Sequence, residues 1–208
     1  VYQWYWRPGR EVLFSALEHV ARERTRNPVV EYLQTLTWDG VPRAERWLID
    51  SCHLDDRVLF RAYGKRWLIG LVARVLKPGC KNDVSLVLSG PQGFGKSTVF
   101  ATLVDWPGFD DELFNDTPIQ RGDKDSLMAL HSCLIYEDAE MASQGIRAQE
   151  ARKAFLSSAV DRLRPPYGRK VRTYKRSSVV VGTTNESEAL LRDQTGSRRY
   201  WVVQCPMN

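Results

Sequence analysis

Apolar residues in the first part of the chain recur with a helical period. Within residues 10–26 they fall on one face of a helix, at Val12, Leu13, Ala16, Leu17 and Val20. Asn27-Pro28 is typical of a helix start, with the asparagine as N-cap and the proline in the first turn. We therefore expect an all-helical region over residues 1–79. Its further helices are expected at 28–36, 42–48 and 56–76.

After Gly79 the pattern changes to short apolar runs separated by helical segments. The runs that read as strands are 84–89, 133–137, 178–183 and 199–203, with a weaker one at 112–115. The helical segments between them are 96–104, 123–131 and 147–159. Alternation of this kind predicts an α/β core over residues 80–208, with a mostly parallel sheet covered by helices on both faces. Ligands of such a sheet bind at the carboxyl ends of the strands.

A glycine-rich loop follows the first expected strand. Residues 90–97 read Gly-Pro-Gln-Gly-Phe-Gly-Lys-Ser, a complete phosphate-binding loop with a strand before it and a helix after it. Its backbone N–H groups would turn toward a polyphosphate, Lys96 would reach the β- and γ-phosphates, and the Ser97 hydroxyl would bind Mg²⁺. We therefore predict a P-loop NTPase core that uses ATP and Mg²⁺; the alternative, a chance glycine-rich turn, does not account for the flanking elements. The expected nucleotide contacts are Gly90, Pro91, Gln92, Gly93, Phe94, Gly95, Lys96, Ser97 and Thr98.

The second core strand, residues 133–136, ends in the acidic sequence Glu137-Asp138-Ala139-Glu140. Acidic groups in this place hold Mg²⁺ or orient the attacking water in ATPases. Glu137 is the first candidate for the carboxylate that holds the metal or activates water, and Glu140 is the second. Asp138 is the third candidate for this role, and it is also a candidate metal ligand. The alternative is a polar cluster that caps the next helix, but the glycine-rich loop favours the functional interpretation.

Two further segments supply candidates for phosphate chemistry. The β-branched run at 179–181 leads to Gly-Thr-Thr-Asn, and Asn185 is the natural sensor of the γ-phosphate or of the attacking water. Alone, this sequence is merely a plausible turn. Arg198 and Arg199 precede the last strand and could neutralise charge on the transferred phosphoryl group, in their own subunit or in a neighbour's site. A pair of surface arginines is the alternative.

The net charge of +5 hides a strong asymmetry. Residues 105–140 contain ten acidic and two basic residues, whereas residues 162–176 contain seven basic residues and no acidic one. An acidic nucleotide half beside a basic strip suits an ATPase that acts on nucleic acid. The basic strip reads as a hairpin with its tip at Tyr167-Gly168, and a basic solvent-exposed loop is the alternative. The candidate nucleic-acid contacts are Arg164, Tyr167, Arg169, Lys170, Arg172 and Lys175.

Other classes of protein are disfavoured by composition. No apolar run approaches the ~20 residues that cross a bilayer, and no secretory signal is visible, so no membrane partner is expected. The four cysteines are far apart, with no C-x-x-C pair. This spacing argues against a zinc site and a disulfide framework, and it suits a reducing cytoplasm.

From Asn27 onward, the sequence segments and their order along the chain resemble the virulence-associated E family of phage and genomic-island P-loop proteins. The resemblance rests on N-P-V-V-E-Y-L, W-D-G-V-P-R, K-R-W-L-I-G, K-P-G-C-K, G-P-Q-G-F-G-K-S-T, V-D-R-L-R-P-P-Y-G-R, G-T-T-N-E and L-R-D-Q-T-G-S-R-R-Y-W. The family looks like a relative of superfamily 3 helicases, which are hexameric AAA+-type motors. Its E-x-x-E pattern fits Glu137 and Glu140, while Asp138 departs from it, so the division of metal and base roles stays open.

The resemblance implies an ATP-hydrolysing DNA translocase or helicase of phage or mobile-element replication, acting in the bacterial cytoplasm. It implies that copies of the chain form a hexameric ring, in which the hairpin of residues 162–176 grips single-stranded DNA. It also implies a primase or primase-like region outside this sequence. Two alternatives stay open: a nucleic-acid-binding assembly ATPase without unwinding, and a P-loop phosphotransferase that acts on small molecules.

Overall fold

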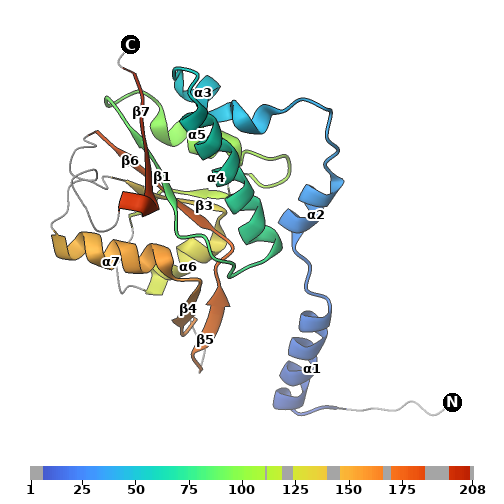
Figure 1. The fold of residues 1–208 in the computed structure, drawn as a ribbon. Coiled ribbons are helices and arrows are strands. Elements are labelled where there is room, and N and C mark those ends of the chain that lie inside the picture. Colours follow the sequence, from blue (N-terminus) through green and yellow to red (C-terminus); the bar gives the residue numbers. More distant parts are fainter. Residues whose placement is uncertain are drawn as a thin grey trace. The chain divides into compact units, whose positions relative to one another are not determined.

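The computed structural model describes residues 7–110, 112–118, 124–139, 146–165, 170–185 and 197–206 (Figure 1). The chain divides into two compact units, Val1–Trp38 and Asp39–Asn208. The smaller unit contains the helices α1 (Arg10–Glu23) and α2 (Pro28–Thr35). The Asn27 side chain accepts hydrogen bonds from the backbone N–H groups of residues 29 and 30, at 3.1 and 3.2 Å. The predicted N-cap is therefore confirmed.

The larger unit begins with three helical elements, η1 (Arg43–Glu45), α3 (Trp47–Cys52) and α4 (Val58–Leu76). In place of one helix over 42–48, the chain forms a short 3₁₀ turn and then α3. Trp67 of α4 is buried between the rings of Trp47 and Phe100, with centroid distances of 5.6 and 6.0 Å. Gly64 permits this packing, because a Cβ there would lie 2.9 Å from the Trp47 indole nitrogen. Contacts therefore group α3 and α4 with the sheet, whereas the sequence suggested a division after residue 79.

The larger unit is built on a five-stranded parallel sheet in the order β2-β3-β6-β1-β7 (Figure 1). The predicted mostly parallel α/β sheet is thus confirmed. Every strand of the central three is buried along most of its length, which explains why their sequences read as continuous apolar runs. The strands are β1 (Ser85–Ser89), β2 (Phe114–Asn115), β3 (Ile135–Ala139), β6 (Val179–Thr184) and β7 (Tyr200–Gln204).

Helices cover both faces of the sheet, as predicted. On one face, α6 (Lys124–Ser132) and α7 (Ile146–Ser157) pack in a core cluster that includes Val87, Tyr136, Val180 and Tyr200. On the other face lie α4 and α5 (Lys96–Leu103). Trp201, next to Tyr200, stacks on Tyr63 of α4 with a ring-centroid distance of 4.8 Å. This alternation follows from the two-residue period of a strand.

A separate antiparallel hairpin consists of β4 (Val160–Leu163) and β5 (Arg172–Lys175), with Leu163 opposite Arg172. The small ribbon predicted within residues 162–176 is therefore confirmed. Because β5 ends four residues before β6 begins, the hairpin lies at the amino end of the parallel sheet (Figure 1). The glycine-rich loop follows the carboxyl end of β1, so the two features occupy opposite ends of the sheet.

Candidate nucleotide-binding site

The glycine-rich loop, residues 90–95, connects β1 to α5 through backbone conformations that favour glycine. Gly93 and Gly95 have φ values of +85° and +80°, in the left-handed region. Glycine is favoured at position 90 for a different reason. A Cβ there would lie 3.2 Å from the Cβ of Cys205 and 3.3 Å from its carbonyl oxygen. The loop therefore needs its glycines for two turns and one close approach, and it ends where α5 begins at Lys96.

The Lys96 ammonium group lies folded over this loop and is only 9% exposed. Its Nζ donates to the carbonyl oxygens of Gly90 and Pro91, both at 2.8 Å, and to Oδ1 of Asn185 at 3.1 Å. These bonds use the three donors of the ammonium group. The structure thus brings the candidate phosphate-binding lysine and the candidate sensor into direct contact, 89 residues apart in sequence.

A second contact joins the first turn of α5 to the acidic strand. Ser97 Oγ donates to Oε1 of Glu137 at 2.8 Å, and the Thr183 hydroxyl donates to the same oxygen. Glu137 is 2% exposed. Within the described part of the chain, its other oxygen, Oε2, is buried and has no hydrogen-bond partner. An unsatisfied buried carboxylate oxygen is costly, which indicates that a ligand completes this site.

The donor set fits Mg²⁺. This cation takes oxygen ligands, keeps several waters, and is held by one or two protein oxygens together with substrate phosphates. Ser97 Oγ and the Glu137 carboxylate supply oxygens of this kind beside the loop that would carry the phosphates. The orphaned Oε2 atom is the specific observation that favours a cation or a cation-bound water here.

Asp138 lies apart from this group. The pleat of β3 directs neighbouring side chains to opposite faces of the sheet, and Asp138 meets Arg152 of α7 there. Arg152 Nε donates to Oδ2 of Asp138 at 2.7 Å, and the arginine is 1% exposed. The structure therefore does not bring Asp138 to Ser97, and its metal role stays a prediction. Glu140 lies outside the described residues.

Sequence reasoning missed two residues of this neighbourhood, Thr183 and Arg152. Thr183 belongs to the Thr-Thr-Asn sequence but had no assigned role beside Asn185. Arg152 stands one turn before Leu156, which packs in the core cluster on that face of α7. A basic residue on the apolar stripe of a helix was the available signal for a buried ion pair.

Two cavities adjoin the glycine-rich loop. The first, of about 290 Å³, is lined by loop residues together with Ala139, Thr183, Thr184 and Asn185. The second, of about 360 Å³, shares Gly95 and Thr98 with the first. Its other lining residues are mostly apolar: Ser51, Phe94, Val99, Thr102 and Leu103. A cavity lined mainly by polar residues and one lined mainly by apolar residues thus adjoin the start of α5, which suits a ligand with a charged part and an apolar part.

The candidate arginines lie at the other end of the sheet. They form η2 (Ser197–Arg199), directly before β7, where Tyr200 pairs with Ser85 at the start of β1. Four residue steps of about 3.3 Å separate that position from the end of β1, a span of roughly 13 Å. Arg199 Nε donates to the Ser157 hydroxyl at 3.0 Å. The structure does not bring either arginine to the glycine-rich loop of its own chain.

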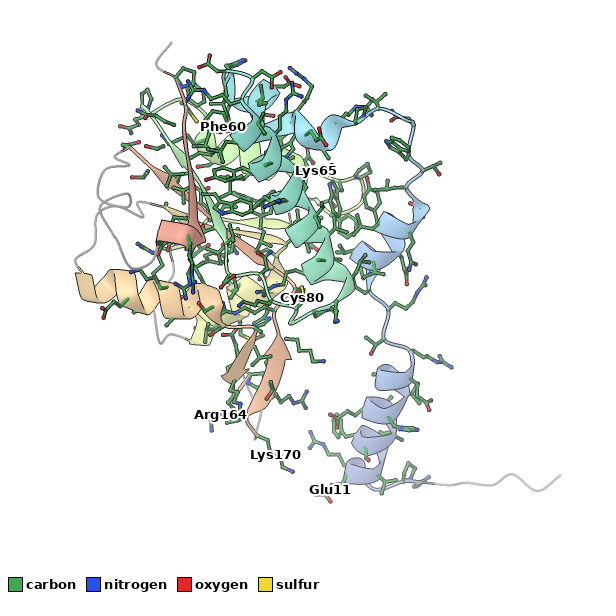
Figure 2. The ribbon with its side chains drawn as sticks, viewed as in Figure 1. Glu11, Phe60, Lys65, Cys80, Arg164 and Lys170 are labelled. Carbon is green, nitrogen blue, oxygen red and sulfur yellow. The ribbon has the colours of Figure 1, made fainter. Side chains whose placement is uncertain are left out.

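The basic residues of the hairpin lie at the amino end of the sheet. Arg164, Lys170, Arg172 and Lys175 are exposed, and Figure 2 shows Arg164 and Lys170 near the free end of the hairpin. The other two candidates, Tyr167 and Arg169, fall outside the described residues. The described candidates thus gather on one projecting element rather than being spread over the surface.

The base of the hairpin is fixed by a buried ionic cluster. Asp161 receives hydrogen bonds from Arg176 to both of its oxygens, at 2.6 and 2.7 Å, and its Oδ2 lies 3.0 Å from Nε2 of His131. Burial would raise the pKa of Asp161, but the hydrogen bonds from Arg176 and His131 outweigh burial and hold this pKa well below its usual range. Arg176 also lies over the Phe155 ring at 4.2 Å. Arg176 is therefore a structural residue of the basic strip.

The parallel sheet, the glycine-rich loop and the Lys96 and Glu137 contacts describe an α/β domain with a candidate nucleotide site. Residues 33–208 match the family model of the Virulence-associated protein E-like domain, so the chain belongs to this family. No curated protein matches the chain. Among its described residues, no helix combines the length and apolar character needed to cross a membrane.

Two solved structures of the NrS-1 C-terminal region share the fold. An A-form apo structure gives a TM-score of 0.52 at 17% identity, and a second apo structure gives 0.51 at 15% identity. Each similarity covers 81% of this chain, which spans 39% of the solved chain. At these identities the similarity concerns the fold, and the site residues are argued from this chain alone.

Proposed function

We propose that this domain binds and hydrolyses Mg²⁺-ATP and uses it to move DNA during the replication of a phage or mobile element. The observation that carries the proposal is the contact between Ser97, Glu137 and Thr183, which leaves one buried carboxylate oxygen beside the glycine-rich loop with no hydrogen-bond partner among the described residues. Membership of the virulence-associated protein E-like family supports the link to mobile elements and their replication.

Ser97 and Glu137 would hold the cation, which supplies positive charge beside the phosphates. Thr183 keeps the Glu137 carboxylate in place through its hydrogen bond to Oε1. Arg152 is a positioning residue, because its ion pair fixes Asp138 and with it the end of β3. The base that deprotonates the attacking water is Glu137 or Glu140, and substitution of each will separate the two.

Lys96 and Asn185 would report the presence of the γ-phosphate. In this structure Lys96 bonds two loop carbonyl oxygens and Asn185. A phosphate offers a charged acceptor and a stronger, charge-assisted hydrogen bond. Lys96 would exchange at least one of its present partners for that phosphate, which frees the Asn185 side chain to contact the phosphate or the attacking water.

The nucleoside would occupy the adjoining apolar cavity. That cavity shares Gly95 and Thr98 with the polar one, so both cavities border the start of α5, where the phosphates would lie. Phe94 offers an aromatic surface to a base, and Leu103 and Val99 complete an apolar lining.

A ring of copies would complete the site. Arg198 and Arg199 are too far from the loop of their own chain to act there, which favours action in a neighbouring subunit. The hairpin projects from the other end of the sheet and presents exposed basic residues suited to DNA phosphates. This position also disfavours a small-molecule phosphotransferase, because the hairpin is remote from the nucleotide pocket and cannot close over it as a lid.

The test is the rate of ATP hydrolysis with and without single-stranded DNA, on a sample whose mass is measured with bound nucleotide. We expect Mg²⁺-dependent hydrolysis, stimulation by DNA, and a defined oligomer. Strong DNA binding with DNA-independent, barely detectable hydrolysis would favour the assembly ATPase. Absence of both nucleotide binding and hydrolysis would overturn the proposal.

A further inference from the structure

A second basic segment packs against the base of the hairpin. Residues 77–81 read Lys-Pro-Gly-Cys-Lys and form the loop that follows α4 and precedes β1. The backbone N–H of Gly79 donates to the carbonyl oxygen of Arg176, the residue after β5, at 2.8 Å. Figure 2 shows Cys80 of this loop near the base of the hairpin. The loop and the hairpin are therefore packed together at the amino end of the sheet, although they are distant in sequence.

The hairpin has one inward face and one outward face. Neighbouring side chains of a strand alternate between the faces, and residues opposite each other in an antiparallel pair share a face. Asp161 is buried, so its face packs inward. Val160 is 42% exposed and pairs with Lys175, which places Lys175 on the outward face. The same alternation places the exposed Arg162 there, and the exposed Arg164 follows directly after β4.

The loop lies against this outward face. A Cβ at Gly79 would lie 3.4 Å from both Cβ and Cγ of Lys175, so the loop backbone contacts the stem of that side chain. Gly79 has a φ of +82°, a conformation that glycine adopts without strain. Lys77 and Lys81 stand on either side of this glycine, and both are exposed. Together the two segments form a surface, here called the basic surface, that consists of Lys77, Lys81, Arg162, Arg164 and Lys175.

The side chains of the basic surface have no acidic partners. Within the part of the chain that the structure describes, none of them forms an ion pair. In contrast, each of the following exposed basic residues of the preceding helical segments pairs with a carboxylate: Arg43, Arg46, Arg57, Arg61 and Lys65. Asp83 is the one acidic residue between positions 77 and 85 and is only partly exposed, so the basic surface keeps a net positive charge.

Helix stability explains only one of these charges. Lys77 directly follows α4, where a positive charge interacts favourably with the helix dipole. Lys81 lies beyond the turn, and Arg162 lies on a strand, so this effect does not apply to them. Like charges on one surface repel each other in the free protein, and a polyanion relieves that repulsion. The basic surface therefore suits a ligand with a row of negative charges.

We propose that residues 77–81 are a second DNA-contacting element, which binds phosphates of the same single strand as the hairpin. Lys77, Lys81 and Arg162 are the contacts that this element and the outward face add to those already assigned to the hairpin. The inference rests on the proposed action on DNA, and it extends that action from one projecting element to two elements that pack together.

The length of the hairpin separates the contacts. Lys175 pairs with Val160, and Arg164 lies four residue steps further along the strand that begins at Val160. At about 3.3 Å for each step, this distance is roughly 13 Å. A strand of DNA carries several phosphates over such a length. The loop at the base of the hairpin and Arg164 therefore contact different phosphates.

The test measures how variants of the intact chain bind a fluorescently labelled single-stranded DNA in the absence of nucleotide. Replacing Lys77 and Lys81 together by alanine removes two phosphate contacts. The log–log salt dependence of binding should become shallower by about 1.4, at about 0.7 for each contact. A rise in salt from about 50 to about 200 mM should then weaken binding about sevenfold less in the variant than in the wild type. Fluorescence anisotropy measures both quantities.

Two control variants separate phosphate contact from other effects. Arg61→Ala combined with Lys65→Ala removes the same net charge, but from ion-paired side chains of α4, and should leave the slope unchanged. Lys77→Arg combined with Lys81→Arg keeps both charges and should keep the wild-type slope. Urea denaturation of the alanine variant measures the contribution of Lys77 to the end of α4, which a purely structural role would confine to stability.

A combined variant tests whether the loop and the hairpin hold one strand. Adding Arg164→Ala to Lys77→Ala and Lys81→Ala should make the slope shallower by about a further 0.7, because a separate phosphate contact is lost. An effect of Arg164→Ala that is present in the wild type but disappears in the combined variant would overturn separate contacts on one strand.

The remaining outcomes decide between the loop and the wider proposal. A wild-type slope in the Lys77 and Lys81 alanine variant, with a shallower slope in Arg164→Ala, would overturn the role of the loop and leave the hairpin alone on DNA. An equally shallow slope in the ion-paired control would overturn it as well, because net charge would then explain the effect. A wild-type protein that binds single-stranded DNA without hydrolysing ATP would overturn the proposed ATPase, while the loop variant would still decide this inference. A wild-type protein that binds no single-stranded DNA would overturn both.

Discussion

Two buried carboxylates at opposite ends of the sheet show how similar burial serves different purposes. At the amino end, Asp161 is 8% exposed and both of its oxygens receive hydrogen bonds from Arg176. At the carboxyl end, Glu137 is 2% exposed and accepts two hydrogen bonds on one oxygen, while the other oxygen has no partner among the described residues. Asp161 is complete without a ligand, whereas Glu137 is incomplete.

The difference separates structural from functional acidic residues. A buried charge that is fully paired contributes to a defined packing, and removal of one partner is costly because the other is left uncompensated. When one oxygen of a buried carboxylate has no protein partner, neutralising the carboxylate destabilises the fold less. The protein then loses the ligand that the negative charge would bind. The comparison therefore predicts opposite results for one type of substitution at the two sites.

The largest effect is expected from Lys96→Ala. The ammonium group is the positive charge that the structure places on the glycine-rich loop, and its loss removes a charge-assisted contact to the phosphates. Hydrolysis should fall below detection and ATP binding should weaken. A radiolabelled or coupled ATPase assay measures the first, and calorimetry measures the second. Lys65→Ala, which breaks an exposed ion pair on α4, is the matched control and should retain activity. Full turnover of Lys96→Ala would contradict the proposed ATPase.

Glu137→Gln tests the incomplete end of the comparison. The amide keeps an oxygen for the Ser97 and Thr183 hydroxyl groups but lacks the negative charge that holds Mg²⁺ or polarises water. We expect turnover to fall by about 10²-fold or more, with ATP binding kept and the free energy of unfolding changed by less than about 1 kcal/mol. Glu140→Gln should do less. If Glu140→Gln has the larger effect on turnover, the catalytic base is Glu140.

Asp161→Asn tests the complete end. The substitution leaves the Arg176 guanidinium buried without its counter-charge, so we expect a loss of about 3–5 kcal/mol in the free energy of unfolding. Urea denaturation measures this loss. The same change at Asp50, whose ion pair with Arg46 is exposed, should cost less than about 1 kcal/mol. Equal losses in Asp161→Asn and Glu137→Gln would remove the distinction between the two carboxylates.

The pH dependence of stability sharpens the same point. The hydrogen bonds to Asp161 hold its folded-state pKa below the ordinary value of an aspartate, which is near 4. A lowered folded-state pKa stabilises the fold fully above the unfolded-state value, and this contribution is lost as the pH falls toward the folded-state value. Stability measured at a series of pH values below about 5 should therefore fall more steeply in the wild type than in Asp161→Asn. Parallel curves would show that Asp161 does not contribute.

Local sequence predicted the elements better than it predicted their contacts. The strands β1, β6 and β7 begin within a residue of their expected starts, because buried parallel strands are continuous apolar runs with clear ends. The loop and Asn185 also lie close together as expected, since the carboxyl ends of parallel strands share one edge. The hydrophobic period of the strands and the glycine-rich motif can each be read within a short stretch of sequence, which is why these features were predicted correctly.

Contacts between distant segments were harder to predict. Arg152 with Asp138, and Thr183 with Glu137, form only when separate elements pack, and no local pattern pairs them. The packing of α4 on the sheet was missed for a related reason. An amphipathic pattern tells which face of a helix is buried but does not tell which surface covers it. The Trp67 contact with Phe100 supplies that information in the structure.

The smallest effect is expected at the hairpin, beyond the buried Asp161 cluster. Arg164 and Lys170 are exposed near its free end, so each can neutralise one DNA phosphate without structural cost. Replacing both by alanine should make the log–log salt dependence of single-stranded DNA binding shallower by about 1.4, at about 0.7 for each contact. Fluorescence anisotropy over a range of salt concentrations measures this slope.

Two control variants should leave this slope unchanged. The first is Lys65→Ala, which removes a basic residue on α4. Because the hairpin and the nucleotide site occupy opposite ends of the sheet, Lys96→Ala should also leave the nucleotide-free slope unchanged. An unaltered slope in the double variant would remove these two residues from DNA binding and leave the hairpin as a charged, solvent-exposed ribbon.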